Sequence, residues 1–441
     1  MLPTYNLAQQ QGKADFEDRL SRLRGTASST SQAAKAVADI LSQVQERGDD
    51  AVVDYMRQWT DPDFNQKRLI VTPEELDAAT AQVNPQLLEA IDQAIDNVRT
   101  YQQHILPHTP DPIRIGAAEL GLRWTPVDSA GLCVPGGTAV LFSTVIMLAV
   151  PALVAGVPAN AISVMNPPPT RKSNEPAADI SPIVLATCKR LGLSRVYRLG
   201  GAQGVAALAY GTETIEPIDL IAGPGNVYVQ LAKAQVSGIT GTDNGFYGPS
   251  EIVTIADDTA DPKRIAADLI AQAEHDPGKC FLVSWSSRII ESITREITSQ
   301  LNQRQRRGAI TASLRDESCA VLVANPAEAV EIANQLATEH LNLAVENPQQ
   351  MMQDIRHAGE IFLGDTPVAS GDYYAGPSHC LPTGTTARFT SGISTYTFLK
   401  RTGTVAYPNG LDPTTANHIA DMAEAEGLDG HAESARIRAK H

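Results

Sequence analysis

Three short segments of this chain carry side chains that could perform acid–base or metal chemistry. The first holds Gln272 and His275, three residues apart in a predicted helix that begins at Asp261 and Pro262 and stops at Pro277. This spacing places both side chains on one face of the helix. Taken alone, they favour a hydrogen-bonded core glutamine and a histidine that interacts with the C-terminal end of the helix dipole. Metal binding is the alternative.

The second segment is the adjacent pair Glu339 and His340, at a predicted helix-to-strand junction. Active sites of open α/β sheets lie at strand ends, where neighbouring side chains can converge on one crevice. A carboxylate could activate water there, beside an imidazole that takes a proton at neutral pH. Taken alone, the pair is more typical of a solvated surface.

The third segment, SGDYYAGPSHCLPTG at residues 370–384, places Asp372, Ser378 and His379 among glycines and prolines. This composition is typical of a functional loop. Two further Gly-Pro loops, AGPGN at 222–226 and YGPSE at 247–251, adjoin predicted strands, where backbone amides can bind phosphate. Neither matches GxGxxG, and each alone is compatible with an ordinary turn.

The elements that must position these segments alternate between short β-branched runs and helix-sized stretches. This alternation is typical of parallel, doubly wound sheets, and we expect two of them. Residues 54–103 are expected to be helical, and 413–441 to form an alanine-rich, acidic helical tail that packs on its own body or on a partner subunit. The predicted strands are 131–134, 161–165, 196–199, 220–221, 252–255, 281–285, 320–323, 343–345 and 361–363.

Length and composition exclude several classes of protein. The 441 residues, 43% hydrophobic and 19% charged, indicate a globular protein of roughly two to four domains. Fifty acidic residues against 35 basic ones give a net charge of -15, which makes nucleic acid a poor partner. The five cysteines are scattered, and the polar N-terminus has no apolar signal core. We therefore expect a cytoplasmic protein.

One apolar stretch, residues 145–157, resembles a membrane span. Pro151, Gly156 and Pro158 interrupt it, and it falls short of the ~20 residues that a spanning helix needs. A buried strand and helix of a parallel sheet is the better interpretation, so no membrane association is expected.

The motifs in combination resemble the histidinol dehydrogenase family. That family oxidises L-histidinol to L-histidine with two NAD molecules, the last step of histidine biosynthesis. The resemblance implies an α/β fold of two incomplete Rossmann-like, doubly wound lobes with small helical N- and C-terminal domains, one zinc ion per subunit and a homodimer. The matching strings, in order, are VPGG at 134–137, GGAQGVAALAYGT at 200–212, AGPGNVYV at 222–229, GPSE at 248–251, QAEH at 272–275, TEHL at 338–341 and the loop at 370–384.

Domain boundaries follow from the same resemblance. Residues 1–26 would form an N-terminal helical arm, and residues 133–250 the NAD-binding lobe. Residues 27–132 and 251–390 would form the lobe that carries the metal and the catalytic site. Residues 391–441 would be a tail domain packed on the partner subunit.

The resemblance also implies a role for each site residue. Glu339 and His340 align with the catalytic pair. The implied zinc ligands are Gln272, His275, Asp372 and His431, the last supplied by the other subunit. Implied substrate contacts are Ser250, His379 and Glu426, together with the four zinc ligands and His340. Implied NAD contacts are Gln203, Asn226 and Cys133, where Cys133 replaces the family's usual tyrosine and so loses its stacking contact.

Two alternatives remain open at this point. An aldehyde dehydrogenase with a covalent thiohemiacetal would need a reactive cysteine near a base, and Cys380 beside His379 is the best candidate. Leu381 and Pro382 follow it rather than a helix N-terminus that would lower its pKa, which favours a structural thiol. A two-lobed metal- or solute-binding protein is the non-enzymatic alternative.

Overall fold

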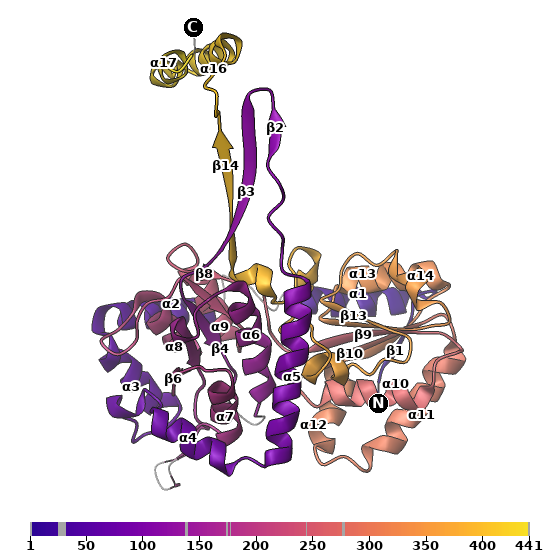
Figure 1. Ribbon diagram of the computed structural model, residues 1–441. Helices are drawn as coiled ribbons and strands as arrows, with labels where there is room; N and C mark the ends of the chain where they lie inside the picture. The colour runs from indigo at the N-terminus through magenta and orange to yellow at the C-terminus, as the bar shows by residue number, and fades with distance from the viewer. Residues whose placement is uncertain are drawn as a thin grey trace. The chain divides into compact units, whose positions relative to one another are not determined.

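The computed structural model describes residues 2–24, 32–136, 140–172, 175–176, 178–243, 245–275 and 278–439 (Figure 1). The chain forms two compact units. The larger comprises Met1–Ile105 and Asp128–Phe398, and the smaller comprises Leu106–Val127 and Leu399–His441. The larger unit contains two parallel sheets, which we call the first and second lobes.

The first lobe is built on six parallel strands in the order β1-β11-β10-β9-β12-β13. Every residue of β9, β10 and β12 is buried, as expected when helices cover both faces of a parallel sheet. Helices α10 (Pro262–Ala273) and α11 (Ser287–Leu301) cover one face, and α1 (Gln10–Arg24) and α13 (Pro326–Leu336) the other (Figure 1). The strands are β1 (Thr4–Asn6), β9 (Glu251–Ala256), β10 (Lys279–Ser284), β11 (Cys319–Leu322), β12 (His340–Ala344) and β13 (Glu360–Leu363).

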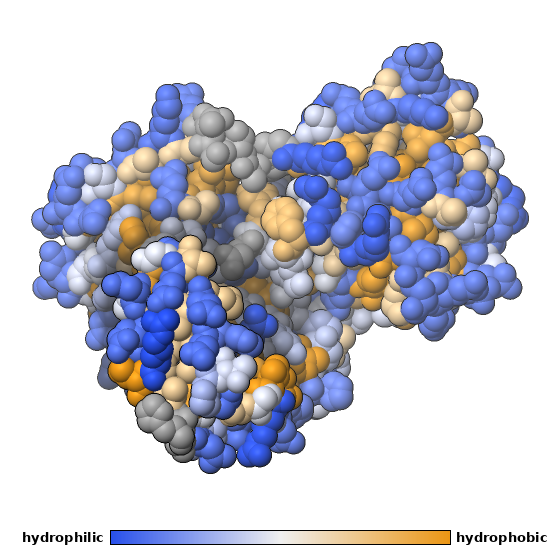
Figure 2. Space-filling model, turned by 90° about the horizontal axis from the view of Figure 1, so that it is seen from above, coloured by the Kyte–Doolittle hydropathy of each residue, from blue (hydrophilic) through white to orange (hydrophobic). Residues whose placement is uncertain are grey.

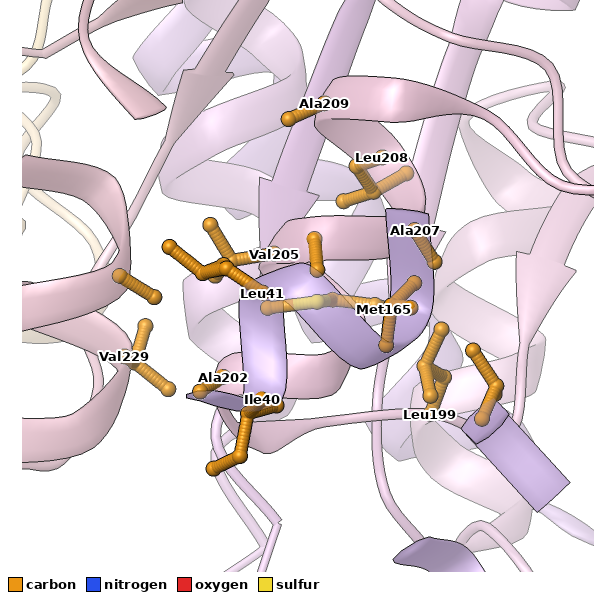
Figure 3. Close-up of a cluster of buried hydrophobic side chains, with 14 of the residues drawn as sticks. Ile40, Leu41, Met165, Leu199, Ala202, Val205, Ala207, Leu208, Ala209 and Val229 are labelled. Carbon is orange, nitrogen blue, oxygen red and sulfur yellow. The ribbon is translucent and has the colours of Figure 1, made fainter. Parts of the chain in front are cut away.

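The second lobe is built on five parallel strands in the order β6-β5-β4-β7-β8. They are β4 (Ala130–Cys133), β5 (Ile162–Met165), β6 (Arg195–Tyr197), β7 (Leu220–Ala222) and β8 (Gly241–Thr242). In Figure 3, Ile40 and Leu41 of α2 (Gln32–Arg47) lie near Ala202, Val205 and Leu208 of α8 (Gly201–Tyr210), all within one buried apolar cluster. Helices α3 (Asp49–Trp59) and α9 (Val227–Val236) complete this layer.

Helix α6 (Phe142–Ala155) carries the apolar stretch of the second lobe and is buried along almost its whole length. It has 14 residues, contains Pro151, and ends at Gly156 in the left-handed conformation. No helix in the described part of the chain is long and apolar enough to cross a membrane. Helix α6 packs against α5 (Pro85–His104) and α7 (Pro182–Arg190), and α4 (Pro73–Gln82) packs against α7.

The smaller unit combines an antiparallel sheet with a helical pair. Its strands, in the order β14-β3-β2, are β14 (Leu399–Ala406), β3 (Ala118–Pro126) and β2 (Ile113–Ile115). Helices α16 (Pro413–Ala425) and α17 (Asp429–Arg436) bury small alanine side chains between them, namely Ala420, Ala423 and Ala432. Three further α-helices of the described residues, α12 (Arg307–Ala312), α14 (Pro348–Met352) and α15 (Ala369–Tyr373), lie in the larger unit.

The fold class predicted from the sequence is confirmed, since both lobes are parallel and doubly wound. The nine predicted strands correspond to β4–β7 and β9–β13, and the expected helical tail is α16 and α17. The face in Figure 2 is mostly hydrophilic, with smaller hydrophobic areas among the polar residues.

The packing differs from the predicted boundaries in three places. The N-terminal segment predicted as a helical arm supplies β1, which pairs with β11 at the edge of the first sheet. Helices α2 and α3, assigned to the first lobe, bury their apolar faces against the second. The smaller unit also contains β2, β3 and β14, which were not predicted. In β14, for example, nearly every residue is exposed, so its sequence lacks the alternation of apolar and polar residues that indicates a strand. The predicted boundary at residue 26, Gly137 and Pro277 lie outside the described residues.

Candidate active site

A cavity of about 510 Å³ lies between the two lobes. The second lobe lines it with the loops that follow β4, β5, β6 and β7, at the carboxyl ends of these strands. The first lobe contributes Glu339, which directly precedes β12. This lobe therefore faces the cavity with the amino end of its sheet. Other first-lobe lining residues are Ser250, His275, Asp372, Tyr373, His379, Cys380 and Leu381.

The second lobe's wall lies at a topological switch point. Strand order reverses between β4 and β7, and the segments 133–136 and 224–227 that follow these two strands both line the cavity. Ligands of open α/β sheets, dinucleotides among them, bind at such a point. Gly223 has φ +118°, and a Cβ there would lie 2.6 Å from the carbonyl oxygen of Cys133, so the loop requires glycine.

Of the predicted NAD contacts, two line the cavity. Cys133 is a buried lining residue at the end of β4, and its burial raises the pKa of its thiol to about 12. Asn226 also lines it and caps α9, its Oδ1 accepting the N–H groups of Tyr228 at 3.0 Å and Val229 at 3.2 Å. Gln203 does not line it, since its side chain is buried with Nε2 3.8 Å from the sulfur of Met56.

Glu339 and His340 lie together at the amino end of β12. Glu339 Oε2 is 3.7 Å from His340 Nδ1 and accepts the backbone N–H of Glu251 at 2.9 Å. His340 Nε2 is 3.4 Å from Asp372 Oδ1, and its ring and that of Phe362 pack in a T-shaped arrangement with centroids 5.7 Å apart. His340 is 2% exposed and is not a lining residue of the cavity, but it lies next to Asp372, which is one.

Burial and neighbouring charges shift the pKa values of both Glu339 and His340. Burial raises the pKa of Glu339 to about 7, and the facing His340 limits the rise. Burial disfavours the cationic form of His340, but the carboxylates of Glu339, Asp372 and Glu360 outweigh it and raise the pKa of His340 to about 9. The two side chains are therefore electrostatically coupled, so that the charge on each one shifts the pKa of the other.

Three of the four predicted zinc ligands come from neighbouring segments of the larger unit. Gln272, in the last turn of α10, is 3% exposed, and its Nε2 has no hydrogen-bond partner among the described residues. His275 follows the helix and lines the cavity, and desolvation lowers its pKa. Although burial raises the pKa of Asp372, the nearby histidines, His340 foremost, outweigh it and lower the pKa.

This donor set fits a zinc ion. A neutral imidazole, an ionised carboxylate and an amide without a full set of partners are suitable ligands for a borderline cation. Within the described residues, no three His, Cys, Asp or Glu side chains are arranged to hold a metal ion. The predicted set has only two such residues in this unit, His275 and Asp372, because Gln272 is an amide and His431 belongs to the smaller unit.

The remaining predicted substrate residues divide between the units. Ser250 and His379 line the cavity. Glu426, at the end of α16, and His431, in α17, are exposed residues of the smaller unit. His431 borders a hollow on that unit formed with Tyr407, Ile419 and Arg438 among others.

Sequence reasoning missed a set of buried polar residues that support this site. Glu251 accepts the N–H of Gly384 at 3.0 Å and pairs with Lys279 Nζ at 3.2 Å, which ties the loop carrying His379 to the amino ends of β9 and β10. Glu360 lies beside His340 in the sheet register, and burial raises the pKa of its carboxyl to about 7. The GPSE string contains Glu251 and could have indicated it, whereas no motif in the sequence marks Lys279 or Glu360.

Comparison with known proteins agrees with this architecture. The family described as histidinol dehydrogenase matches residues 23–439. The histidinol dehydrogenase of Bacillus subtilis (strain 168) is 42% identical over 423 residues, which cover 96% of each chain. The enzyme of the same name from Synechococcus sp. is 42% identical over 405 residues, 91% of each chain.

Solved structures give the same result. The crystal structure of histidinol dehydrogenase from Elizabethkingia anophelis matches with a TM-score of 0.88 at 29% identity, covering 99% of this chain and 98% of that one. The chain therefore belongs to the histidinol dehydrogenase family of oxidoreductases.

Proposed function

We propose that this protein is a cytoplasmic, zinc-dependent homodimer that oxidises L-histidinol to L-histidine through a bound aldehyde, the last step of histidine biosynthesis. Converting an alcohol to an acid removes four electrons, so the reaction consumes two NAD molecules, each taking one hydride. The observation that carries the proposal is the buried pair Glu339 and His340, which adjoins a cavity whose opposite wall is the switch point of a Rossmann-like sheet.

His340 acts as the base of the first oxidation. It accepts the hydroxyl proton of histidinol as hydride leaves the neighbouring carbon for NAD. The carboxylates around the ring raise its pKa and so strengthen it as a proton acceptor. The proton that His340 holds at rest, and the proton that it takes in the first oxidation, must each leave before the ring can act again. Glu339, whose Oε2 is 3.7 Å from Nδ1 and which lines the cavity, can pass each proton on to solvent and so return to the carboxylate form.

Glu339 acts between the two oxidations. An aldehyde must be hydrated before it can lose a second hydride, and Glu339 removes a proton from the attacking water. Its pKa of about 7 suits this task, because a general base works best when its pKa is near the operating pH. His340 then takes the hydroxyl proton of the hydrate in the second oxidation. Completing both steps in one cavity keeps the electrophilic aldehyde away from free amines.

Zinc would be held by Gln272, His275 and Asp372, with His431 supplied by the second subunit. When bound, the ion would serve as a template for the imidazole and amine of histidinol and polarise its oxygen. Ser250, His379 and Glu426 would complete the substrate site. Asn226 at the N-terminus of α9 and Cys133 would contact NAD from the second lobe's wall of the cavity.

Measuring the NADH formed per histidinol tests this proposal. Purified protein with zinc and excess NAD should form two NADH per histidinol and release histidine. One NADH with aldehyde released would instead indicate a simple alcohol dehydrogenase. Histidinol binding without any NADH would support the solute-binding alternative and reject the proposed activity.

A further inference from the structure

Both ring nitrogens of His379 are already bonded within the protein. Nδ1 lies 2.7 Å from the backbone carbonyl oxygen of Asp372, and Nε2 lies 3.0 Å from the hydroxyl oxygen of Thr144. A carbonyl oxygen can only accept, so Nδ1 must carry a hydrogen. In the neutral ring that carries this hydrogen, Nε2 is an acceptor, and Thr144 donates its hydroxyl hydrogen to it.

This contact joins the two lobes. Thr144 is 1% exposed in α6 of the second lobe, whereas His379 lies in the first-lobe loop after α15. Both residues line the cavity. The hydroxyl of Thr144 therefore bonds a first-lobe loop to α6 of the second lobe, at the wall of the cavity.

A second bond holds the same loop on the same helix. Pro151 has no N–H, so the carbonyl of Met147, four residues earlier, lacks its partner within α6. The hydroxyl of Ser378 donates to this carbonyl oxygen at 2.9 Å. Pro151 thus leaves the Met147 carbonyl oxygen free to accept a hydrogen bond from the loop. Two consecutive loop residues, Ser378 and His379, are therefore bonded to α6.

We propose that Thr144 is a positioning residue for His379 in the proposed histidinol oxidation, on which this inference rests. The Asp372 carbonyl selects the ring form with hydrogen on Nδ1, and the Thr144 hydroxyl donates to Nε2 of that form and fixes the ring in the cavity wall. With both nitrogens engaged, His379 has no free lone pair for a metal ion, although it lies beside Asp372. The ring is left to contact the substrate through its carbon atoms, which suits packing against the imidazole of histidinol.

Three variants test this role. Thr144→Val keeps the side-chain shape but removes the hydroxyl, and Thr144→Ser restores it. Thr187→Val is the matched control, because Thr187 is a fully buried threonine in α7 of the same lobe whose hydroxyl donates to the carbonyl oxygen of Ile183, within its own helix, at 2.7 Å. If the valine variant does not fold, Thr144→Ala replaces it.

Steady-state kinetics give the first readout. A hydrogen bond worth about 0.5–1.5 kcal/mol predicts that Thr144→Val raises the KM for histidinol about two- to tenfold. The KM for NAD should stay unchanged, Thr144→Ser should restore the histidinol KM, and Thr187→Val should leave both constants at wild-type values. A histidinol KM unchanged in Thr144→Val, or raised equally in Thr187→Val, would overturn the inference.

Ring-nitrogen chemical shifts of nitrogen-15 histidine-labelled protein give a readout independent of activity. His379, assigned by its loss in His379→Asn, should show a protonated Nδ1 and an accepting Nε2 in the wild type. Thr144→Val should move the Nε2 shift, and Thr187→Val should not. Failure of wild-type protein to oxidise histidinol would reject the proposed function, while these shifts would still decide the role of Thr144.

Discussion

Oε2 of Glu339 lies 3.7 Å from Nδ1 of His340, with both side chains buried. Adjacent residues of a regular strand point to opposite faces of a sheet. Glu339 directly precedes β12, and the backbone N–H of Glu251 holds its carboxylate at the same sheet edge as the ring. The two groups therefore face each other at one sheet edge, but their proposed tasks differ, and this difference can be measured.

Glu339→Gln should damage the aldehyde-to-acid half of the reaction more than the alcohol-to-aldehyde half, because only the former needs hydration. Loss of a general base predicts a decrease of about 100- to 10,000-fold when the aldehyde is supplied directly. Glu360→Gln is the matched control, since it also removes a carboxyl near His340 but leaves Glu339 in place. Equal damage to both halves in Glu339→Gln would reject the division of labour.

His275→Ala should lose both the bound metal and turnover, because it removes the only imidazole among the proposed ligands of the larger unit. Metal analysis and NADH formation measure the two effects. His104→Ala, at an exposed histidine at the end of α5, should change neither. Full activity of chelated protein shown by analysis to be free of metal would exclude the zinc requirement.

His431 should act on the site of the other subunit. His431→Ala and His275→Ala homodimers should each be inactive. A heterodimer of the two should have one complete site of its two, so random one-to-one reassembly should recover about a quarter of wild-type sites by symmetry. No recovery, despite verified subunit exchange, would show that His431 does not serve the neighbouring site.

The cysteines should be unreactive in the folded protein, since all five are free and buried. Burial raises the pKa of the Cys380 thiol, so the nucleophilic thiolate needed by the aldehyde dehydrogenase alternative does not form at neutral pH. A thiol reagent should modify none of them before unfolding, and Cys380→Ala should retain turnover. An inactive but folded Cys380→Ala protein would favour the covalent alternative.

The buried pair Lys233 and Asp243 should hold the glycine loop beside the NAD wall. Lys233 Nζ is 2.8 Å from the carboxylate and 2.8 Å from the carbonyl oxygen of Gly223, whose N–H donates to the same carboxylate at 2.7 Å. Lys233→Met leaves a buried, unpaired charge and should lower the free energy of unfolding by about 3–5 kcal/mol.

Chemical denaturation measures this change. The double variant Lys233→Met/Asp243→Leu should recover most of the stability, because it leaves no unpaired charge, but it should still raise the KM for NAD since Gly223 loses its partners. A double variant as unstable as the single one would argue against the charge as the cause.

The alternation of strands and helices was predictable from the sequence, because hydrophobic periodicity is a local property. Buried parallel strands such as β9 and β10 are mostly apolar runs, and the N-cap Asp261 marked the start of α10. The motifs also indicated the family before the three-dimensional structure was considered. By contrast, β3 and β14 pair across more than 270 residues and are largely not buried, so neither carried a local signal.

Only the tertiary structure decided how the chemical groups meet. General rules place ligands at the carboxyl ends of parallel strands, and the second lobe follows them, but Glu339 and His340 lie at the amino end of the first sheet. The contact of Thr144 with His379 joins residues 235 positions apart. The pKa values of Glu339 and His340 depend on burial and on charges from β13 and α15. Such properties arise from distances between distant segments, which residue types and spacing along the chain do not contain.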